Sequence, residues 1–122
     1  FALNNAGIAS ECVGFSEIKP HAIKCFQANH KGVKGFGDCT QIEPSKLPDF
    51  DLLTAGFPCQ PFSEAGTRKG EMDIRGTLFN EIMRIAEVKK PKYMLLENVR
   101  GLTFRNMKDT FDKILLDLEN IV

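Results

Sequence analysis

Residues 51–63 read Asp-Leu-Leu-Thr-Ala-Gly-Phe-Pro-Cys-Gln-Pro-Phe-Ser, and the rest of the expected fold is arranged around them. The apolar run at 51–57 is typical of a short buried strand. Pro58 ends that strand because proline lacks the backbone N–H of a ladder and fixes its own φ. Cys59 therefore follows the carboxyl end of a strand, which is where ligands bind in open α/β sheets. A thiol held between two prolines at that position predicts a nucleophilic cysteine.

On either side of this stretch, the sequence alternates between strand and helix patterns. The other predicted elements are a strand over 10–15, a helix over 20–29 that begins at Pro20, a helix over 77–89 capped by Thr77, a strand over 93–96 and a helix over 107–122. Strands alternating with helices are typical of a parallel sheet. We therefore expect an α/β fold, a partial parallel sheet with helices on both faces.

The chain length of 122 residues predicts one domain that is large enough to bury a core. The first residue is Phe1, and residues 1–7 read as the end of a helix with Gly7 at its C-cap. This start indicates a fragment whose upstream strand is missing.

Charge and cysteine content exclude several classes of protein. Sixteen basic and sixteen acidic residues cancel, so contact with nucleic acid needs a local patch or a part of the protein outside this chain. The four cysteines have no metal-type spacing, and without a secretion signal they are expected to be reduced thiols of a cytosolic protein. No apolar stretch approaches the ~20 residues that cross a bilayer. We predict no metal site and no membrane span.

Chemistry-bearing side chains follow the ends of the predicted strands. Cys59 follows one apolar run and Glu97 the next, so a right-handed crossover brings a thiol and a carboxyl group into one crevice. Glu17 follows the strand at 10–15, and Asp38 begins another loop. Taken singly, the three acidic residues are also what solvated loops contain. Cys12 and Cys25 are predicted core residues, and the two histidines are predicted surface residues.

Taken together, these residues resemble the C5 cytosine-specific DNA methyltransferase family, whose members use S-adenosylmethionine. The stretches that carry the resemblance are Gly56–Ser63, similar to the catalytic-cysteine motif; Arg75–Phe79, similar to the helix start after the mobile loop; Glu97–Val99, similar to the catalytic-glutamate motif; and Glu17 and Gly37–Asp38, similar to two acidic cofactor-binding positions. The order is that of the family, and the matches span nearly the whole chain.

The resemblance implies a Rossmann-like fold of S-adenosylmethionine-dependent methyltransferases and a role for each matching residue. The implied catalytic residues are Cys59 and Glu97. The implied cofactor-binding residues are Glu17, Ile18, Asp38, Cys39, Phe57 and Pro58, with Glu17 on the ribose hydroxyls and Asp38 on the adenine amino group. The implied substrate-binding residues are Gln60, Ser63, Arg75 and Asn98.

The resemblance also implies a mechanism. Cys59 adds to carbon 6 of a cytosine flipped out of the duplex, while Glu97 interacts with N3. That role asks for a protonated Glu97 with a raised pKa in an enclosed pocket. Carbon 5 then takes the methyl group, and the loop from Ser63 to Arg75 closes over the nucleotide.

Several parts of such enzymes are missing from residues 1–122, which we expect to form a partial catalytic domain. The absent parts are the first strand with its glycine-rich turn, an arginine-containing motif, the target-recognition domain and the C-terminal helix. We expect the chain alone neither to methylate DNA nor to bind it selectively, and the full-length parent to be the DNA-binding species. An incomplete sheet edge favours self-association of the fragment.

Alternative functions stay open at this point. The leading hypothesis is a cytoplasmic DNA methyltransferase from a bacterium or phage, related to restriction-modification systems. A transfer-RNA cytosine methyltransferase shares the same nucleophile and cofactor. A non-catalytic remnant that acts as a binding module, or a redox cysteine, belongs to a different class. The recognition sequence and the oligomeric state cannot be read from these residues.

Overall fold

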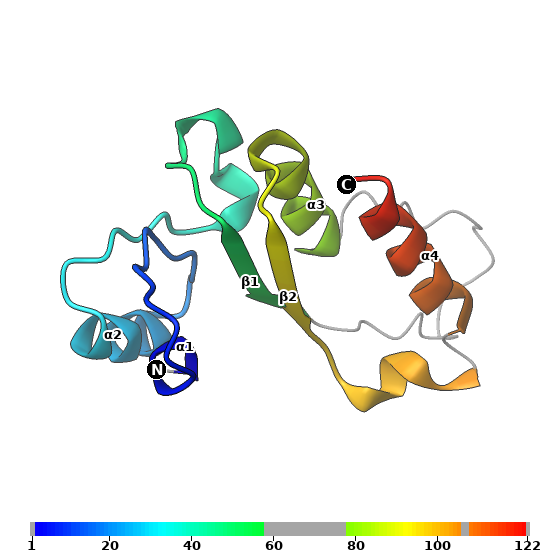
Figure 1. Ribbon diagram of the computed structural model, residues 1–122, viewed down its shortest axis with the longest axis horizontal. Helices are drawn as coiled ribbons and strands as arrows, with labels where there is room; N and C mark the ends of the chain where they lie inside the picture. Colours follow the sequence, from blue (N-terminus) through cyan, green and yellow to red (C-terminus); the bar gives the residue numbers. More distant parts are fainter. Residues whose placement is uncertain (1, 58–77, 106–107, 122) are drawn as a thin grey trace. The chain divides into compact units, whose positions relative to one another are not determined.

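The computed structural model describes residues 2–57, 78–105 and 108–121, and these residues form two compact units. The first unit comprises residues 1–48, and the second comprises residues 49–122. In Figure 1 the first runs from blue through cyan, and the second from green to red. The predicted site residues are divided between them, because Glu17 and Asp38 belong to the first unit and Glu97 to the second.

The second unit contains the predicted parallel sheet. Strand β1 (Leu52–Gly56) and strand β2 (Tyr93–Glu97) lie side by side, with Leu52 opposite Tyr93 and Gly56 opposite Glu97. Helix α3 (Leu78–Lys89) connects them, so this is a βαβ crossover. The sequence predicted all three elements to within about a residue, and the predicted N-cap, Thr77, lies outside the described residues.

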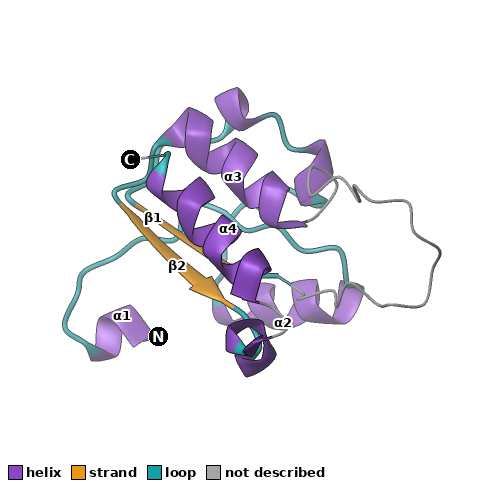
Figure 2. Ribbon diagram, turned by 90° about the vertical axis from the view of Figure 1, so that its right-hand side faces the viewer, coloured by secondary structure: helices purple, strands orange, loops and turns teal. Residues whose placement is uncertain are grey.

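The hydrophobic core of the second unit is built mainly on α3. Its buried side chains are Phe79, Met83, Ile85 and Ala86, joined by Leu102 of the 3₁₀ helix η4 (Arg100–Thr103). Helix α4 (Lys108–Glu119) follows, and α3 and α4 lie on the same side of the sheet (Figures 1 and 2). Burying a large apolar side chain contributes roughly 1.5–3 kcal/mol, so α3 is the element that stabilises this unit most.

The two faces of β2 differ in exposure. Met94 and Leu96 are half-buried and share one face, because side chains alternate along a strand. Tyr93, Leu95 and Glu97 share the other face and are exposed. Glu97 therefore ends β2 on the exposed face of the strand.

Two ion pairs hold the segment that precedes β1. The Lys89 ammonium lies 2.9 Å from a carboxylate oxygen of Asp49, and the Lys92 ammonium lies 2.7 Å from Asp51. The Lys89 side chain is only 10% exposed, whereas both side chains of the second pair are 73% exposed. Lys89 therefore depends more on its partner, because a shielded charge is costly to leave unpaired.

The first unit begins with a short helix that ends as the sequence predicts. Helix α1 (Ala2–Asn5) is followed by Gly7 at φ 74°, and the Ile8 amide donates to the Leu3 carbonyl at 2.9 Å. A positive φ at this position favours glycine. Helix α2 (Pro20–Asn29) begins at its proline as predicted, and two 3₁₀ helices follow, η1 (Cys39–Gln41) and η2 (Pro44–Lys46).

The predicted strand over 10–15 is wrong. In the described residues of this unit the pairing is a single parallel bridge between Phe15 and Gly35. The Phe15 amide donates to the Lys34 carbonyl at 3.0 Å, and the Phe36 amide donates to the Phe15 carbonyl at 2.8 Å. Gly14 precedes Phe15 and Gly35 is itself a bridge residue, and glycine lacks the side chain that stabilises a longer ladder. The Phe15 ring instead stacks on Phe26 of α2, with ring centroids 4.2 Å apart.

Candidate functional site

The carboxyl ends of β1 and β2 bring Glu97 and Gly56 together. They are opposite each other in the parallel register. A Cβ atom added to Gly56 would lie 3.3 Å from Oε2 of Glu97, so the carboxylate extends over the glycine backbone. The predicted meeting of the two strand ends is therefore present, and Gly56, the first residue of the Gly56–Ser63 stretch, had no predicted role of its own.

Asn98 joins the same two strand ends through its side chain. Its Nδ2 donates to the Phe57 carbonyl at 2.8 Å, and its Oδ1 accepts from the Val99 amide at 2.8 Å. The Phe57 amide donates to the Glu97 carbonyl at 3.4 Å, and the Phe57 ring contacts Phe79, with centroids 5.3 Å apart. Phe57 is therefore held from three directions at the end of β1.

Five of the predicted site residues lie outside the described residues. They are Pro58, Cys59, Gln60, Ser63 and Arg75. Phe57 is the last described residue before them, two positions from Cys59 along the chain. The roles of these five residues stay predictions.

Glu97 differs from expectation in its surroundings. The sequence places it after the strand, but it is the last residue of β2. Its side chain is exposed, so the described part of the chain does not enclose it as the predicted general-acid role requires.

In the first unit, Glu17 is fixed by its own backbone. Its Oε1 accepts from the amides of Ile18 and Lys19, at 2.8 and 2.9 Å. The hydrogen bond from the Lys19 amide, followed by that from Ile18, lowers the pKa of Glu17 below its ordinary 4.5. The carboxylate is therefore ionised at neutral pH, and no described residue donates a hydrogen bond to its Oε2.

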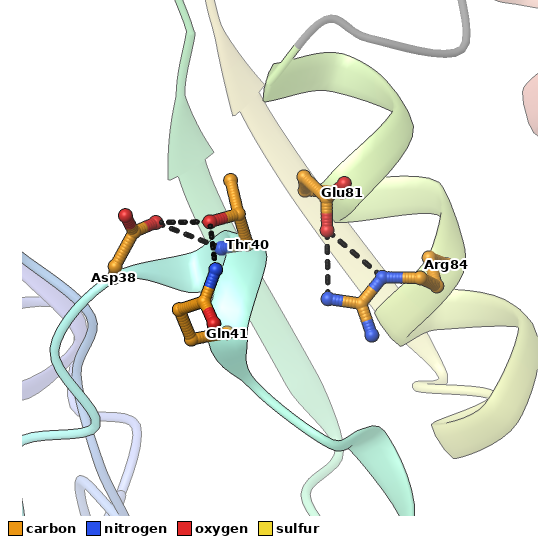
Figure 3. Close-up of polar contacts among 5 residues, drawn as sticks. All are labelled: Asp38, Thr40, Gln41, Glu81 and Arg84. Atoms are coloured by element: carbon orange, nitrogen blue, oxygen red, sulfur yellow. Dashed lines mark hydrogen bonds and ion pairs between the residues drawn. The ribbon is translucent and has the colours of Figure 1, made fainter.

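Asp38 repeats this arrangement at the start of η1 (Figure 3). Its Oδ1 accepts from the Thr40 amide at 2.9 Å and from the Thr40 hydroxyl at 2.8 Å. These bonds, the amide first, lower the pKa of Asp38 below its ordinary 3.8. Here too the second carboxylate oxygen accepts from none of the described residues.

One hydrogen bond joins the two segments that carry Glu17 and Asp38. The Ser16 hydroxyl donates to the Gly37 carbonyl at 2.6 Å, and each of these residues directly precedes one of the two acids. Gly37 has φ 72°, which favours glycine at this turn. Ser16 and Gly37 were not singled out as site residues, because 21 positions separate them and no local pattern predicts their contact.

The paired acids fit the cofactor that the sequence resemblance implies. A ribose diol and an adenine amino group are hydrogen-bond donors, and an ionised carboxylate only accepts. Glu17 and Asp38 each have one oxygen engaged locally and the other without a described donor. Beside them, Ile18 is 66% exposed and Cys39 is half-buried, so an apolar surface is available next to the acids.

Two groups of side chains have no part in this site. Cys12 and Cys25 are exposed, so their predicted core position is wrong. On α3, Arg84 pairs with Glu81 at 2.7 Å (Figure 3), beside a crevice between α3 and α4. The described residues contain no group of His, Cys, Asp or Glu that could hold a metal ion. Among the described helices, none has the length and apolar character of a membrane span.

Comparison with known proteins gives a consistent match along the chain. The profile of the family described as C-5 cytosine-specific DNA methylase matches residues 1–121. The Type II methyltransferase M.NgoBV of Neisseria gonorrhoeae is 50% identical over 113 residues, which are 93% of this chain and 27% of that protein. The orphan methyltransferase M.SPRI of Bacillus phage SPR is 45% identical, over 97% of this chain and 29% of its own length.

Among solved structures, the S. pombe Dnmt2 methyltransferase is similar, with a TM-score of 0.65 and 27% sequence identity. The match covers 95% of this chain and 37% of that protein. It confirms the expected Rossmann-like methyltransferase fold for the residues present. The chain thus spans less than two fifths of each of these three proteins.

Proposed function

This chain belongs to the C-5 cytosine-specific DNA methylase family, and from that premise we propose that it is part of a DNA cytosine-5 methyltransferase that uses S-adenosylmethionine. Its relatives are named as Type II methyltransferases of bacteria and as orphan methyltransferases of phages. We therefore propose a cytoplasmic enzyme related to restriction-modification systems. The observation that carries the proposal is the parallel register that sets Glu97 opposite Gly56, three residues before Cys59.

The cofactor is held by the first unit in this proposal. Glu17 accepts from the ribose hydroxyls and Asp38 from the adenine amino group, each through the oxygen that its own backbone leaves open. Ile18 packs against the adenine ring, with Cys39 beside it. When bound, S-adenosylmethionine supplies an electrophilic methyl group.

In this proposal, residues of the second unit carry out the reaction on the cytosine base. The Cys59 thiolate forms a bond to carbon 6 of the cytosine, and the electron pair of the carbon 5–carbon 6 double bond moves toward carbon 5. Glu97 donates a hydrogen bond to N3, which makes carbon 6 a better electrophile. After methylation, loss of the carbon 5 proton restores the double bond, and Cys59 leaves as the thiolate. Gln60, Ser63, Arg75 and Asn98 are the proposed contacts to the flipped nucleotide.

The proposed function explains why the Glu97 side chain is exposed in the described residues. The relatives that match are more than three times as long as the match, so their remaining sequence is available to close over the strand ends. Exclusion of water favours the protonated form of a carboxyl group, which is the form that donates. We therefore propose that the 122 residues alone do not methylate DNA.

A hybrid enzyme tests the proposed function. The 27% of M.NgoBV that matches is replaced by this chain, and transfer of labelled methyl groups from S-adenosylmethionine to DNA and to transfer RNA is measured. We expect methylated DNA, no methylated transfer RNA, and no activity after Cys59→Ser. Cys12→Ser is the matched control, because that thiol is exposed and outside the site.

The alternatives give different results in the same assay. Labelled transfer RNA without labelled DNA would assign the chain to the RNA-modifying class. A folded hybrid that binds S-adenosylmethionine but methylates neither substrate would favour a non-catalytic binding module. Undiminished methylation by the Cys59→Ser hybrid would reject the proposed nucleophile.

A further inference from the structure

One segment of this neutral chain carries charge of a single sign. Residues 18–37, which we name the lysine segment, contain four lysines and no aspartate or glutamate, whereas the rest of the chain has twelve basic and sixteen acidic residues. The four lysines are Lys19, Lys24, Lys31 and Lys34, and all are exposed. Because the net charge of the chain is zero, contact with nucleic acid needs a local basic patch, and the lysine segment has that charge.

Three of the four ammonium groups have no acidic partner among the described residues. Lys19 is set aside, because it lies close enough to Glu17 for the two charges to interact. Lys24, Lys31 and Lys34 form no ion pair within residues 2–57, 78–105 and 108–121. Their charges are therefore available to an external anion.

Phe15 joins helix α2 to the loop that follows it, so these lysines are carried on one packed framework. The Phe15 ring stacks on Phe26 of α2, and backbone hydrogen bonds of 3.0 and 2.8 Å join Phe15 to Lys34 and Phe36 of the loop. Lys24 is two positions before Phe26, about 200° around the helix axis, so it points away from this contact. The Lys34 ammonium lies 5.0 Å from the centroid of the Phe36 ring, a contact that retains its positive charge.

Lys31 is held at the end of α2. It follows His30, whose amide donates to the Phe26 carbonyl at 2.8 Å and whose ring centroid lies 4.6 Å from that of Phe26. The carbonyl end of a helix favours a cation, so the charge suits its position. Gly32 follows with φ 80°, a value that favours glycine, and turns the chain toward Lys34.

The phosphate backbone of duplex DNA is the anion that this surface fits. Duplex DNA carries about one negative charge per 1.7 Å of its axis, and lysine ammonium groups bind phosphates as point charges. The lysine segment contains no arginine, the side chain that most often reads guanine through two hydrogen bonds. Contact with phosphates and not with base edges is therefore expected.

We propose that the lysine segment binds the phosphate backbone of duplex DNA, independently of base sequence, through Lys24, Lys31 and Lys34. The inference rests on the proposed function and deepens it, because it gives the DNA substrate a contact surface in the first unit, in addition to the proposed contacts of the flipped nucleotide. Such binding is unselective, in agreement with the expectation that this chain alone does not bind DNA selectively.

The salt dependence of DNA binding tests the proposal. Fluorescence anisotropy of a short labelled duplex gives the dissociation constant of the 122-residue chain from low to physiological salt, for two unrelated DNA sequences. The variant combines Lys24→Gln with Lys31→Gln. The matched control combines Lys46→Gln with Lys92→Gln, which removes the same two charges from lysines that are also exposed, with 77% and 73% exposed side chains, but lie in ion pairs.

We expect both DNA sequences to bind equally, with a slope of log K against log salt of about −2.7, because each lysine–phosphate contact contributes about −0.9. The Lys24→Gln, Lys31→Gln variant should reduce the magnitude of the slope by about 1.8 and weaken binding at low salt by about tenfold or more. The control variant should leave the slope unchanged. The same comparison is made in the hybrid enzyme, where DNA binding is measured without any need for methylation.

Equal weakening by the two variants would overturn the proposal, since net charge and not this surface would then determine binding. Absence of salt-dependent binding to duplex DNA would overturn it as well. Tighter binding to single-stranded RNA, or to vesicles that contain phosphatidylserine, would assign the surface to another partner.

The two proposals fail separately. An inactive hybrid enzyme in which the Lys24→Gln, Lys31→Gln variant lowers the slope as expected would reject the proposed function and leave the DNA contact standing. A methylating hybrid whose DNA binding is unaffected by that variant would reject the contact and leave the proposed function standing.

Discussion

The two units hold their acidic residues in opposite ways. In the first unit, Glu17 and Asp38 accept hydrogen bonds from residues one or two positions away. In the second, the position of Glu97 depends on a strand about forty residues earlier in the chain. The comparison shows that a carboxylate can be fixed and ionised by its own neighbours in sequence, whereas the position of Glu97 opposite Gly56 requires the long-range fold.

The largest expected effect comes from removing the acid function that we propose for Glu97. In the hybrid enzyme, Glu97→Gln should lower kcat by about 10²–10⁴-fold, because the amide is a much weaker proton donor to N3. The dissociation constant of S-adenosylmethionine should stay unchanged, and isothermal titration calorimetry measures it. If Glu97→Gln weakened cofactor binding and left kcat unchanged, the proposed assignment of cofactor binding to the first unit and of chemistry to the second would be wrong.

The complementary change is Glu17→Gln in the first unit. Loss of a charge-assisted hydrogen bond should weaken S-adenosylmethionine binding by about tenfold or more, with little change in kcat at saturation. Glu43→Gln is the matched control, since Glu43 is in the same unit and pairs with Lys46 instead. Equal weakening by both substitutions would show that general charge, and not the site, determines binding.

Gly56→Ala tests whether the strand register positions Glu97. The new methyl group would lie 3.3 Å from Oε2 of Glu97, so the carboxylate must shift. Because a small misplacement in an active site lowers the rate strongly, we expect kcat of the hybrid to fall by about tenfold or more. Thermal unfolding checks that the variant is folded, and a folded variant with unchanged kcat would contradict the proposed geometry.

Asp49→Asn tests the dependence of the second unit on long-range ion pairs. It leaves the 10%-exposed Lys89 side chain without its partner, and we expect the free energy of unfolding to fall by about 1 kcal/mol. The matched change is Asp51→Asn, whose partner Lys92 is 73% exposed, and its expected loss of stability is smaller. Urea denaturation measures both, and equal losses would contradict this difference.

The smallest effect concerns pH and the first unit. The pKa values of Glu17 and Asp38 are lowered in the folded chain, so their contribution to stability is present at neutral pH and lost as pH falls below 4.5 and 3.8. The unfolding temperature of the wild-type chain should therefore decrease more steeply from about pH 5 to about pH 3 than that of a Glu17→Gln, Asp38→Asn double variant. Parallel curves would show that the local hydrogen bonds do not favour the ionised forms.

The sequence alone predicted most helices and strands because their signals are local. Pro20 starts α2, Gly7 ends α1, and apolar runs mark β1 and β2. The adjacency of the two strand ends was also predictable, since a helix between two parallel strands normally makes them neighbours.

What the sequence did not predict depends on contacts between distant residues. The Ser16–Gly37 and Asn98–Phe57 hydrogen bonds join positions 21 and 41 apart, and no local pattern predicts a contact between such distant positions. The strand over 10–15 failed for a related reason, because its partner segment is rich in glycine and supports only one bridge. The exposure of Cys12 shows that residue type does not determine burial.

The most direct test of the central claim is covalent trapping. The hybrid enzyme is incubated with S-adenosylmethionine and DNA containing 5-fluorocytosine, whose carbon 5 cannot lose a proton, and the trapped peptide is identified by mass spectrometry. We predict an adduct on Cys59 that forms much more slowly in Glu97→Gln. An adduct on another residue, or none from a folded hybrid that binds S-adenosylmethionine, would contradict a thiol and a carboxyl group acting on one cytosine.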